Sequence, residues 1–354
     1  MTNDNKAFNR LQGVITSFQE HCLLAAAAEL DFFTLILQHN NQITSRELAD
    51  IAESNLYGTT ILLNALTGLG YLVKRCINCT DSPQQDKERM KNSNVMYSVA
   101  EDFKTLLDSR HPETFIHIIR HLSCVQRSWT ELARTIKTGQ LTAVRPSILG
   151  VKQDEISFIM AMDSIALLAV EKNIENLRRA GLLNFHNFID IGGASGTYAL
   201  AFLQELPESR GTIFNLDVGI EAAKERFIGS EYESRITLQA GDFMKENLPR
   251  GFDFAWVSAI IHQFNYDENL ILYKKIFNAL ESGGIIAIRD FVMNSDKSAP
   301  KDGLLFEVNM LAELNSGAVY SFDEIKDSLE SVGFKEVEFS VQTETMSSIV
   351  IARK

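Results

Sequence analysis

The stretch Phe185–Gly196 reads Phe-His-Asn-Phe-Ile-Asp-Ile-Gly-Gly-Ala-Ser-Gly. An apolar run that ends in an acidic residue and a glycine cluster is typical of a buried parallel strand that enters a tight turn. Apolar residues at helical spacing follow from Ser195 to Leu206. Strand, glycine turn and helix in this order predict a nucleotide-binding βα unit, whose helix N-terminus offers free N–H groups to a ligand.

The acidic residue in front of the glycines narrows the choice of ligand. A nicotinamide-binding turn would read Gly-x-Gly-x-x-Gly and would set its glycines against a pyrophosphate. A carboxylate at Asp190 would repel a pyrophosphate but would attract an ammonium group. The turn therefore favours a ligand that is cationic at this end, and S-adenosylmethionine carries both an ammonium and a sulfonium.

Apolar runs alternate with helical segments on the C-terminal side of the turn. The expected strands are residues 211–216, 236–240, 252–258 and 284–290. This alternation predicts a doubly wound α/β sheet. Two last runs, 335–340 and 347–352, have only a short polar link between them and predict an antiparallel hairpin at the end of the sheet. We expect the sheet domain to span 185–354, after a linking helix within 154–184.

Residues 1–153 predict a mainly helical domain. A helix pair over about 13–37 is followed by a capping box at Thr44–Glu47, a helix over 59–69 and a strand at 71–74, and a polar stretch 78–94 leads to a returning strand at 95–99. This order is typical of a winged helix-turn-helix, with the polar stretch as its wing. The helix over 59–69 carries residues suited to packing instead of basic residues, which disfavours DNA binding.

Composition limits the partners of the chain. It has 354 residues, 45% of them hydrophobic, and a formal net charge of −12, whereas sequence-independent nucleic-acid binding needs a basic surface. Neither a signal peptide nor a run long enough to span a membrane is visible. We therefore expect no nucleic-acid or membrane partner.

The cysteines and histidines carry little chemistry of their own. Four cysteines are too few for a disulfide framework, which favours a reducing cytoplasm. Cys76 and Cys79 form a single Cys-x-x-Cys without a second pair, so we expect ordinary thiols and no zinc site. His117 and His121 lie one helical turn apart within the helix expected over 115–136, but without a third ligand they predict pocket or core residues and no metal.

With these residues in view, the chain resembles the S-adenosylmethionine-dependent small-molecule O-methyltransferases. That family includes plant caffeate and hydroxyindole enzymes and bacterial polyketide and bacteriochlorophyllide enzymes. The resemblance extends over nearly the whole chain: the winged-helix dimerisation domain, the segment Ser128-Trp-Thr-Glu-Leu, the glycine motif and the C-terminal hairpin. It implies a homodimer that transfers a methyl group to a small molecule, most often at a hydroxyl oxygen. An apolar face along residues 23–30 also favours a second subunit.

The resemblance also assigns the cofactor site. It implies that Asp190, Gly192 and Gly193 hold the amino acid end. In Phe214-Asn-Leu-Asp-Val, Asn215 replaces the family's ribose-binding acid, with Asp217 as the reserve candidate. The resemblance further implies that Asp242 accepts from the adenine amino group and that Phe243 lies against the adenine ring. Ser258, at the end of the strand expected over 252–258, is the last predicted cofactor-binding residue.

The catalytic segment is Ile260-Ile-His-Gln-Phe264, and in the resembled family its histidine is the general base. A free imidazole pKa near about 6.5 suits proton removal at neutral pH, so His262 fits the role, although a histidine merely bonded in a loop is the alternative. Asp290 takes the place of the first of two acidic partners. The second falls in a segment, 316–321, that has no acid, and the sequence leaves open whether Glu307 or Glu313 replaces it.

The acceptor pocket is the least determined part of the site. Its expected lining is Met162, Trp129, His117, His121, Phe264 and Asn309. The same residue types would also make an ordinary interdomain core. Methylation of sulfur or carbon, other chemistry with the same cofactor, and a non-catalytic winged-helix regulator stay as alternatives, and the sequence does not identify the acceptor.

Overall fold

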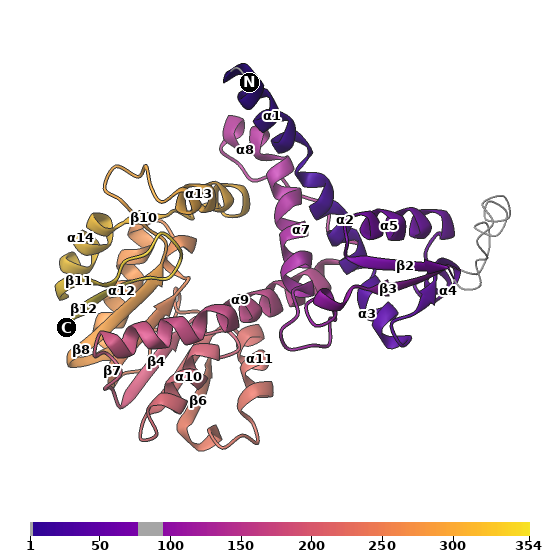
Figure 1. Ribbon diagram of the computed structural model, residues 1–354. Coiled ribbons are helices and arrows are strands. Elements are labelled where there is room, and N and C mark those ends of the chain that lie inside the picture. Colours follow the sequence, from indigo (N-terminus) through magenta and orange to yellow (C-terminus); the bar gives the residue numbers. More distant parts are fainter. Residues whose placement is uncertain (1–2, 77–94) are drawn as a thin grey trace, which may run out of the picture. The chain divides into compact units, whose positions relative to one another are not determined.

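The computed structural model describes residues 3–76 and 95–354, except for the side chains of residues 3–5. The chain divides into two compact units (Figure 1). The N-terminal unit comprises Met1–Gln126 with Arg145–Ser164, and the C-terminal unit comprises Arg127–Val144 with Ile165–Lys354. Two helices, α7 (Ile116–Thr130) and α9 (Val151–Arg179), contribute residues to both units.

A seven-stranded sheet in the order β11-β12-β8-β7-β4-β5-β6 forms the centre of the C-terminal unit. Its strands are β4 (Asn187–Ile191), β5 (Arg210–Asn215), β6 (Ile236–Ala240), β7 (Phe252–Ser258), β8 (Leu280–Asp290), β11 (Lys335–Val341) and β12 (Ser348–Arg353). Neighbours from β6 to β8 run parallel, while β12 is antiparallel to both β8 and β11. The predicted doubly wound sheet with a terminal hairpin is confirmed.

Side-chain alternation along the strands builds a core on each face of this sheet. Phe188, Phe254 and Trp256 face a core shared with α9, α10 (Thr197–Glu205) and α11 (Asp217–Phe227). The other face packs against α12 (Tyr266–Ala279) and α14 (Phe322–Val332). Helices on both faces leave the carboxyl edge of the parallel strands, where such folds bind ligands, to the loops.

Shorter elements complete the C-terminal unit. They are α8 (Leu132–Thr138), α13 (Lys301–Glu313), the 3₁₀ turns η2 (Glu233–Arg235) and η3 (Ile261–Gln263), and the parallel pair β9 (Val292–Met293) and β10 (Tyr320–Ser321). Capping boxes at Asn265–Glu268 and Ser321–Glu324 start α12 and α14, because each pair of side chains bonds two backbone N–H groups that the helix leaves free.

The N-terminal unit is mainly helical. It contains α1 (Asn3–Thr16), α2 (Phe18–Glu29), α3 (Phe32–Gln38), α4 (Ser45–Ile51), α5 (Leu56–Gly68), the 3₁₀ turn η1 (Glu101–Phe103) and the antiparallel sheet β1 (Ile43–Thr44), β3 (Val95–Val99) and β2 (Leu72–Cys76). The capping box at Thr44–Glu47 is confirmed. The polar stretch predicted as a wing, 78–94, and Cys79 lie outside the described residues.

Two expectations for this part of the chain are wrong. Residues 115–136 do not form one helix: α7 ends at Thr130, and Glu131, with φ −95° and ψ 1°, caps the separate helix α8. Cys76 is disulfide-bonded instead of being an ordinary thiol. In neither case does a local sequence pattern mark the difference.

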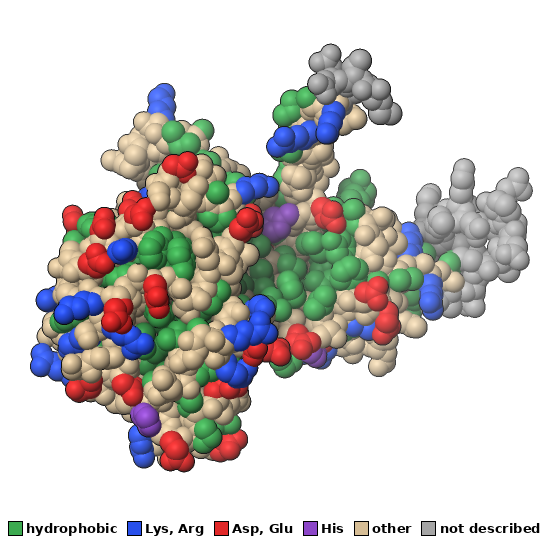
Figure 2. Space-filling model, turned by 60° about the vertical axis from the view of Figure 1, so that its left-hand side comes forward, with side chains coloured by type: hydrophobic (Ala, Val, Ile, Leu, Met, Phe, Trp, Pro, Cys, Tyr) green, Lys and Arg blue, Asp and Glu red, His purple; other side chains and the backbone are tan. Residues whose placement is uncertain are grey.

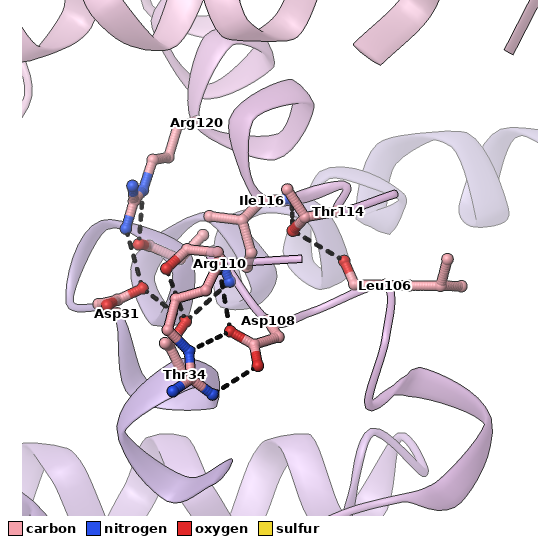
Figure 3. Close-up of polar contacts among 10 residues, drawn as sticks. Asp31, Thr34, Leu106, Asp108, Arg110, Thr114, Ile116 and Arg120 are labelled. Carbon is pink, nitrogen blue, oxygen red and sulfur yellow. Dashed lines mark hydrogen bonds and ion pairs between the residues drawn. The ribbon is translucent and has the colours of Figure 1, made fainter. Parts of the chain in front are cut away.

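Polar contacts join helices of the N-terminal unit that are distant in sequence (Figure 3). The Arg120 guanidinium donates from Nε to the Ala28 carbonyl at 2.8 Å and from Nη2 to Asp31 Oδ1 at 3.1 Å. Asp31 also accepts from the Thr34 hydroxyl at 2.9 Å. The Arg120 side chain is 11% exposed and that of Asp31 37%, and the contacts join α7 to the end of α2 and the start of α3.

Acidic and basic side chains are interspersed over the face of the molecule shown in Figure 2. This differs from the continuous basic surface that nucleic-acid binding requires. Among the described residues, no helix is both long and apolar enough to cross a bilayer.

Candidate active site

The glycine turn opens directly after β4. Gly192 and Gly196 have φ of 70° and 81°, and Gly196 caps α10 in the left-handed conformation. A Cβ at Gly192 would lie 2.3 Å from Ile260 Cδ1, and one at Gly193 would lie 2.5 Å from the Asp190 carboxyl carbon. Any side chain at either position would therefore displace a neighbour, which explains why the turn needs glycine.

Asp190 places a carboxyl group under this turn. Its side chain is 1% exposed, and its Oδ2 has no hydrogen-bond partner. Desolvation raises the pKa of Asp190 to about 7, although a backbone hydrogen bond from Ala199 acts in the opposite direction. A buried carboxyl with a free oxygen fits a ligand that brings a positive charge, as the sequence predicts.

The predicted ribose residues follow β5. Asn215 accepts from the Leu216 N–H at 2.8 Å through Oδ1, so its amide nitrogen is turned toward α11, where a Cβ on Gly219 would meet it at 2.3 Å. Asp217 is the exposed first residue of α11. Asn215 ends β5 and Asp217 begins α11, so both lie at the carboxyl edge of the sheet, and the choice between them stays a prediction.

Asp242 and Phe243 lie in the loop after β6. Asp242 Oδ2 pairs with Lys245 Nζ at 2.9 Å and Oδ1 accepts from the Met244 N–H at 2.9 Å. The hydrogen bond from Lys245 is the main cause that lowers the pKa of Asp242, so this carboxylate is ionised and can accept from an amino group. Phe243 is 8% exposed and meets the Phe264 ring edge-on at 5.8 Å.

Lys275, a residue that the sequence did not point out, holds this loop from α12. Its Nζ donates to the carbonyl oxygens of Phe243, Met244 and Glu246, each at 2.8 Å. Three hydrogen bonds to one ammonium use all its donors. The loop that carries Asp242 and Phe243 is thus fixed to the helix behind it.

His262 and Asp290 form a buried pair at the carboxyl edge of the sheet. Asp290 is the last residue of β8, and both of its carboxylate oxygens lie 2.9 Å from His262 Nδ1. The two residues are 6% and 0% exposed. With the carboxylate on Nδ1, the stable neutral tautomer carries its proton there and leaves Nε2 as the basic nitrogen. The described residues offer no hydrogen bond to Nε2.

Other contacts fix the imidazole further. Phe306 of α13 meets it edge-on, with centroids 4.7 Å apart and planes at 88°. The carbonyl of His262 accepts from the Ala318 N–H at 2.9 Å. Gln263 bonds the Ala259 carbonyl at 3.1 Å and does not touch the ring. Among the described residues neither Glu307 nor Glu313 bonds His262; burial raises the pKa of Glu313, which Ser128 partly offsets.

Trp129 and Asn309 meet within the C-terminal unit. The indole N–H donates to Asn309 Oδ1 at 2.8 Å, which joins the end of α7 to α13. The remaining predicted acceptor residues, His117, His121 and Met162, belong to the N-terminal unit.

Those histidines have different surroundings from His262. Burial lowers the pKa of both His117 and His121, so both are neutral at physiological pH. His121 packs edge-on against Phe158 at 5.2 Å, and His117 Nδ1 is buried without a partner. Within residues 3–76 and 95–354, no three His, Cys, Asp or Glu side chains are grouped so as to hold a metal ion.

Ser258 ends β7 and accepts a 3.1 Å hydrogen bond from Arg289 Nη1. Arg289 is a second residue that the sequence analysis did not select. A charged residue inside the apolar run 284–290 is the signal that could have revealed it, because arginine is rarely buried unless paired.

A family model described as the O-methyltransferase domain matches residues 147–335. The chain is similar to acetylserotonin O-methyltransferase of Gallus gallus, with 24% identity over 343 residues that cover 94% of this chain and 93% of that protein. It is also similar to 3-hydroxy-5-methyl-1-naphthoate 3-O-methyltransferase of Streptomyces sahachiroi, with 30% identity over 170 residues, 48% of this chain and 47% of that protein.

A solved structure has the same fold over its full length. The crystal structure of human N-acetylserotonin methyltransferase in complex with SAM superposes with a TM-score of 0.79 at 21% identity, covering 100% of this chain and 99% of that one.

Proposed function

The chain belongs to the O-methyltransferase domain family, and from this premise we propose that it transfers the methyl group of S-adenosylmethionine to a hydroxyl oxygen of a small molecule, with His262 as the general base. The observation that carries the proposal is the buried pair of His262 and Asp290 at the carboxyl edge of β7 and β8. A doubly wound sheet binds its ligands at this edge.

The residues around the glycine turn fit the proposed cofactor. The unpartnered Oδ2 of Asp190 suits its ammonium group, and glycine at 193, where a Cβ would collide with Asp190, lets the Asp190 carboxyl lie against the backbone of the turn. Asn215 or Asp217 would hold the ribose, and Asp242 and Phe243 the adenine. When bound, S-adenosylmethionine supplies a methyl group that its sulfonium already activates.

Proton removal is the task of the His262 and Asp290 pair. Nε2 takes the proton of the acceptor hydroxyl as the oxygen gains its bond to carbon, and Asp290 stabilises the imidazolium through the proton on Nδ1. The packing of Phe306 against the ring holds Nε2 in one direction. Positioning and exclusion of water supply the rest of the rate.

We propose Phe264, Trp129 and Asn309 as part of the acceptor site, whereas the roles of Met162, His117 and His121, which belong to the N-terminal unit, stay a prediction. The hydrogen bond between Trp129 and Asn309 supports the first group, because it sets an aromatic face beside α13, the helix that also carries Phe306. Aromatic and apolar side chains suit a flat acceptor.

We also propose the domain organisation and a homodimer. Residues 1–153 would form a winged-helix dimerisation domain, 154–184 a linking helix and 185–354 the cofactor-binding domain. The order of α4, α5, β2 and β3 supports the first. Exposed apolar residues of α1 support the dimer, among them Phe8 at 63%, Leu11 at 65% and Ile15 at 67%. The cytoplasmic location stays a prediction.

Replacement of the base tests the reaction. We expect His262→Ala to lower kcat by on the order of 10²- to 10⁴-fold, with N-acetylserotonin and 3-hydroxy-5-methyl-1-naphthoate as probe acceptors and radiolabelled S-adenosylmethionine as methyl donor. Affinity for S-adenosylhomocysteine, measured by isothermal titration, should stay unchanged because His262 does not lie in the glycine turn.

The control is His186→Ala, since the His186 side chain is 81% exposed and pairs only with Asp253. Unaltered turnover in His262→Ala would rule out the general base. Failure of the unmodified protein to bind S-adenosylhomocysteine would contradict the cofactor assignment itself.

Light scattering tests the dimer. We expect the unmodified protein to elute with twice the chain mass and the variant Leu11→Glu/Ile15→Glu to elute as a monomer, because two charges would have to be buried in the interface. Ile228→Glu, at a residue 62% exposed on the C-terminal unit, is the control. A monomeric unmodified protein would contradict the assignment.

A further inference from the structure

Arg289 is a buried cation near the carboxyl end of β8. Its side chain belongs to β8 and is part of a residue that is only 6% exposed. Nη1 donates to Ser258 Oγ at 3.1 Å, and the guanidinium carbon lies 5.7 Å from the centre of the Tyr198 ring. Its Nε is buried and has no hydrogen-bond partner.

None of the described carboxylates pairs with this guanidinium: its partners are a neutral hydroxyl and an aromatic face. Arginine stays charged in proteins, so it cannot escape the cost of burial by losing its proton. A buried charge needs an opposite charge and hydrogen bonds to offset desolvation. The Arg289 guanidinium thus needs an anionic partner, and no described residue supplies one.

Asp190 is a buried acid that lacks a cationic partner among the described residues. It is buried, its Oδ2 has no partner, and the described residues form no ion pair with it. In the sheet register Asp190 lies opposite Trp256, and Arg289 lies opposite Ser258, two residues further toward the carboxyl end. Because alternate residues share a face, Asp190, Ser258 and Arg289 all project from the same side of neighbouring strands.

A single α-amino acid group would satisfy both residues. It carries an ammonium and a carboxylate on the same carbon atom, and Asp190 and Arg289 project from the same face of β4 and β8, the two strands that flank β7. We propose that Arg289 binds the α-carboxylate at the amino acid end of the cofactor while Asp190 faces its ammonium. This inference rests on the proposed function and adds the anionic half of the cofactor site.

The surroundings of Arg289 support a polar binding site. Asn173 of α9 is 0% exposed and donates to the Tyr198 hydroxyl at 2.8 Å, yet its Oδ1 has no partner. The Trp256 indole N–H on the same face is also buried without one. Several unpaired polar atoms beside one buried cation are typical of a site that a ligand completes.

Titration with three ligands separates the parts of the cofactor. S-adenosylhomocysteine has the ammonium and the carboxylate, decarboxylated S-adenosylmethionine lacks the carboxylate, and 5′-methylthioadenosine lacks both. We expect Arg289→Met to weaken S-adenosylhomocysteine binding on the order of 10- to 100-fold, because a charge-assisted hydrogen bond is lost. The affinities for the other two ligands should stay unchanged.

Two further variants complete the design. Arg289→Lys keeps the charge and should recover part of the affinity, and Arg353→Met, which removes a half-exposed arginine from β12, should leave all three affinities unchanged. Without ligand, Arg289→Met should melt at the temperature of the unmodified protein or above it, since it removes an unpaired buried charge. A merely structural arginine would lower that temperature.

The outcomes are distinguishable. Equal loss of affinity for all three ligands, or unchanged affinity for S-adenosylhomocysteine, would overturn the assignment of Arg289 while leaving the methyltransferase proposal intact. A carboxylate that belongs to the acceptor would appear as unchanged S-adenosylhomocysteine affinity with a raised KM for 3-hydroxy-5-methyl-1-naphthoate. If the unmodified protein bound none of the ligands, the proposed function itself would fail.

Discussion

At the scale of single residues, burial decides what Asp190 and His262 can do. Both lie at the carboxyl edge of the same sheet, but their hydrogen-bond partners differ. Asp190 has an oxygen without a partner, whereas His262 is held by both oxygens of Asp290. The Asp190 carboxyl is thus left to pair with a charged group of a ligand, whereas the His262 ring is held in an orientation in which Nε2 can accept a proton.

The raised pKa of Asp190 predicts how stability depends on pH. Its pKa rises from 3.8 to about 7 on folding, so the ligand-free folded state holds the proton more tightly than the unfolded state. The free energy of unfolding should therefore fall as pH rises from about 4 to 7. Asp190→Asn removes this dependence. The free energy of unfolding of the variant, relative to that of the unmodified protein, should therefore rise by about 2 to 3 kcal/mol between pH 5 and pH 8.

Urea denaturation at both pH values, without ligand, measures the effect. The exposed Asp327→Asn serves as the matched control, and its stability difference from the unmodified protein should not vary in this way. A constant difference for Asp190→Asn would show that the buried carboxyl does not titrate in this range. The same variant should bind S-adenosylhomocysteine more weakly at pH 8, because it lacks the carboxylate that faces the ammonium.

At the scale of elements, loops carry the site and helices hold the loops. The loop after β6 that carries Asp242 and Phe243 has no regular structure of its own, but α12 restrains it through Lys275. Helix α13 likewise restrains His262, the proposed base, by packing Phe306 against its ring. A loop pre-positioned in this way loses less conformational entropy when the ligand binds.

Lys275→Met tests this restraint. We expect affinity for 5′-methylthioadenosine, which has the adenine but no amino acid end, to fall, and the free energy of unfolding to drop by about 1.5 to 3 kcal/mol because three carbonyl groups lose a charged donor. The adjacent Lys274→Met is the control: its ammonium donates a longer hydrogen bond, 3.4 Å to the Val332 carbonyl, and lies 5.3 Å from the centre of the Phe277 ring. Equal effects of both variants would contradict a specific role for Lys275.

At the scale of the whole molecule, the residues proposed to hold the cofactor all belong to the C-terminal unit. The N-terminal unit has a separate core, built around Phe32, Phe33 and Tyr97. Cofactor binding should therefore stabilise the C-terminal unit directly and leave the core of the N-terminal unit largely unaffected.

Hydrogen exchange with mass spectrometry measures this difference. S-adenosylhomocysteine should slow exchange in peptides that cover 188–200, 240–247 and 256–264, while peptides from 30–72 should be unchanged. Gly193→Arg is the control, because even a Cβ at this position would lie 2.5 Å from Asp190, and its exchange should not respond to the ligand. Equal protection of both units would show that cofactor binding orders the whole molecule.

The sequence by itself determined the sheet and its terminal hairpin, and it supplied the candidates for the site residues. Strand 252–258 and the glycine turn follow from local patterns, since apolar periodicity, turn glycines and caps act over a few residues. His262 and Asp290 were found through the resemblance, as positions in two separate motifs. Local patterns could not reveal the break between α7 and α8.

Only the tertiary structure decided which side chains complete each other. The bond from Nδ1 to Asp290, the three contacts of Lys275 and the unpaired guanidinium of Arg289 join residues that are far apart in the chain. Such contacts depend on strand order, register and the angle at which helices pack, and no window of sequence contains these quantities. The sequence thus specifies the chemical type of each side chain. The fold decides its partner, and hence its charge state and the orientation of the side chain.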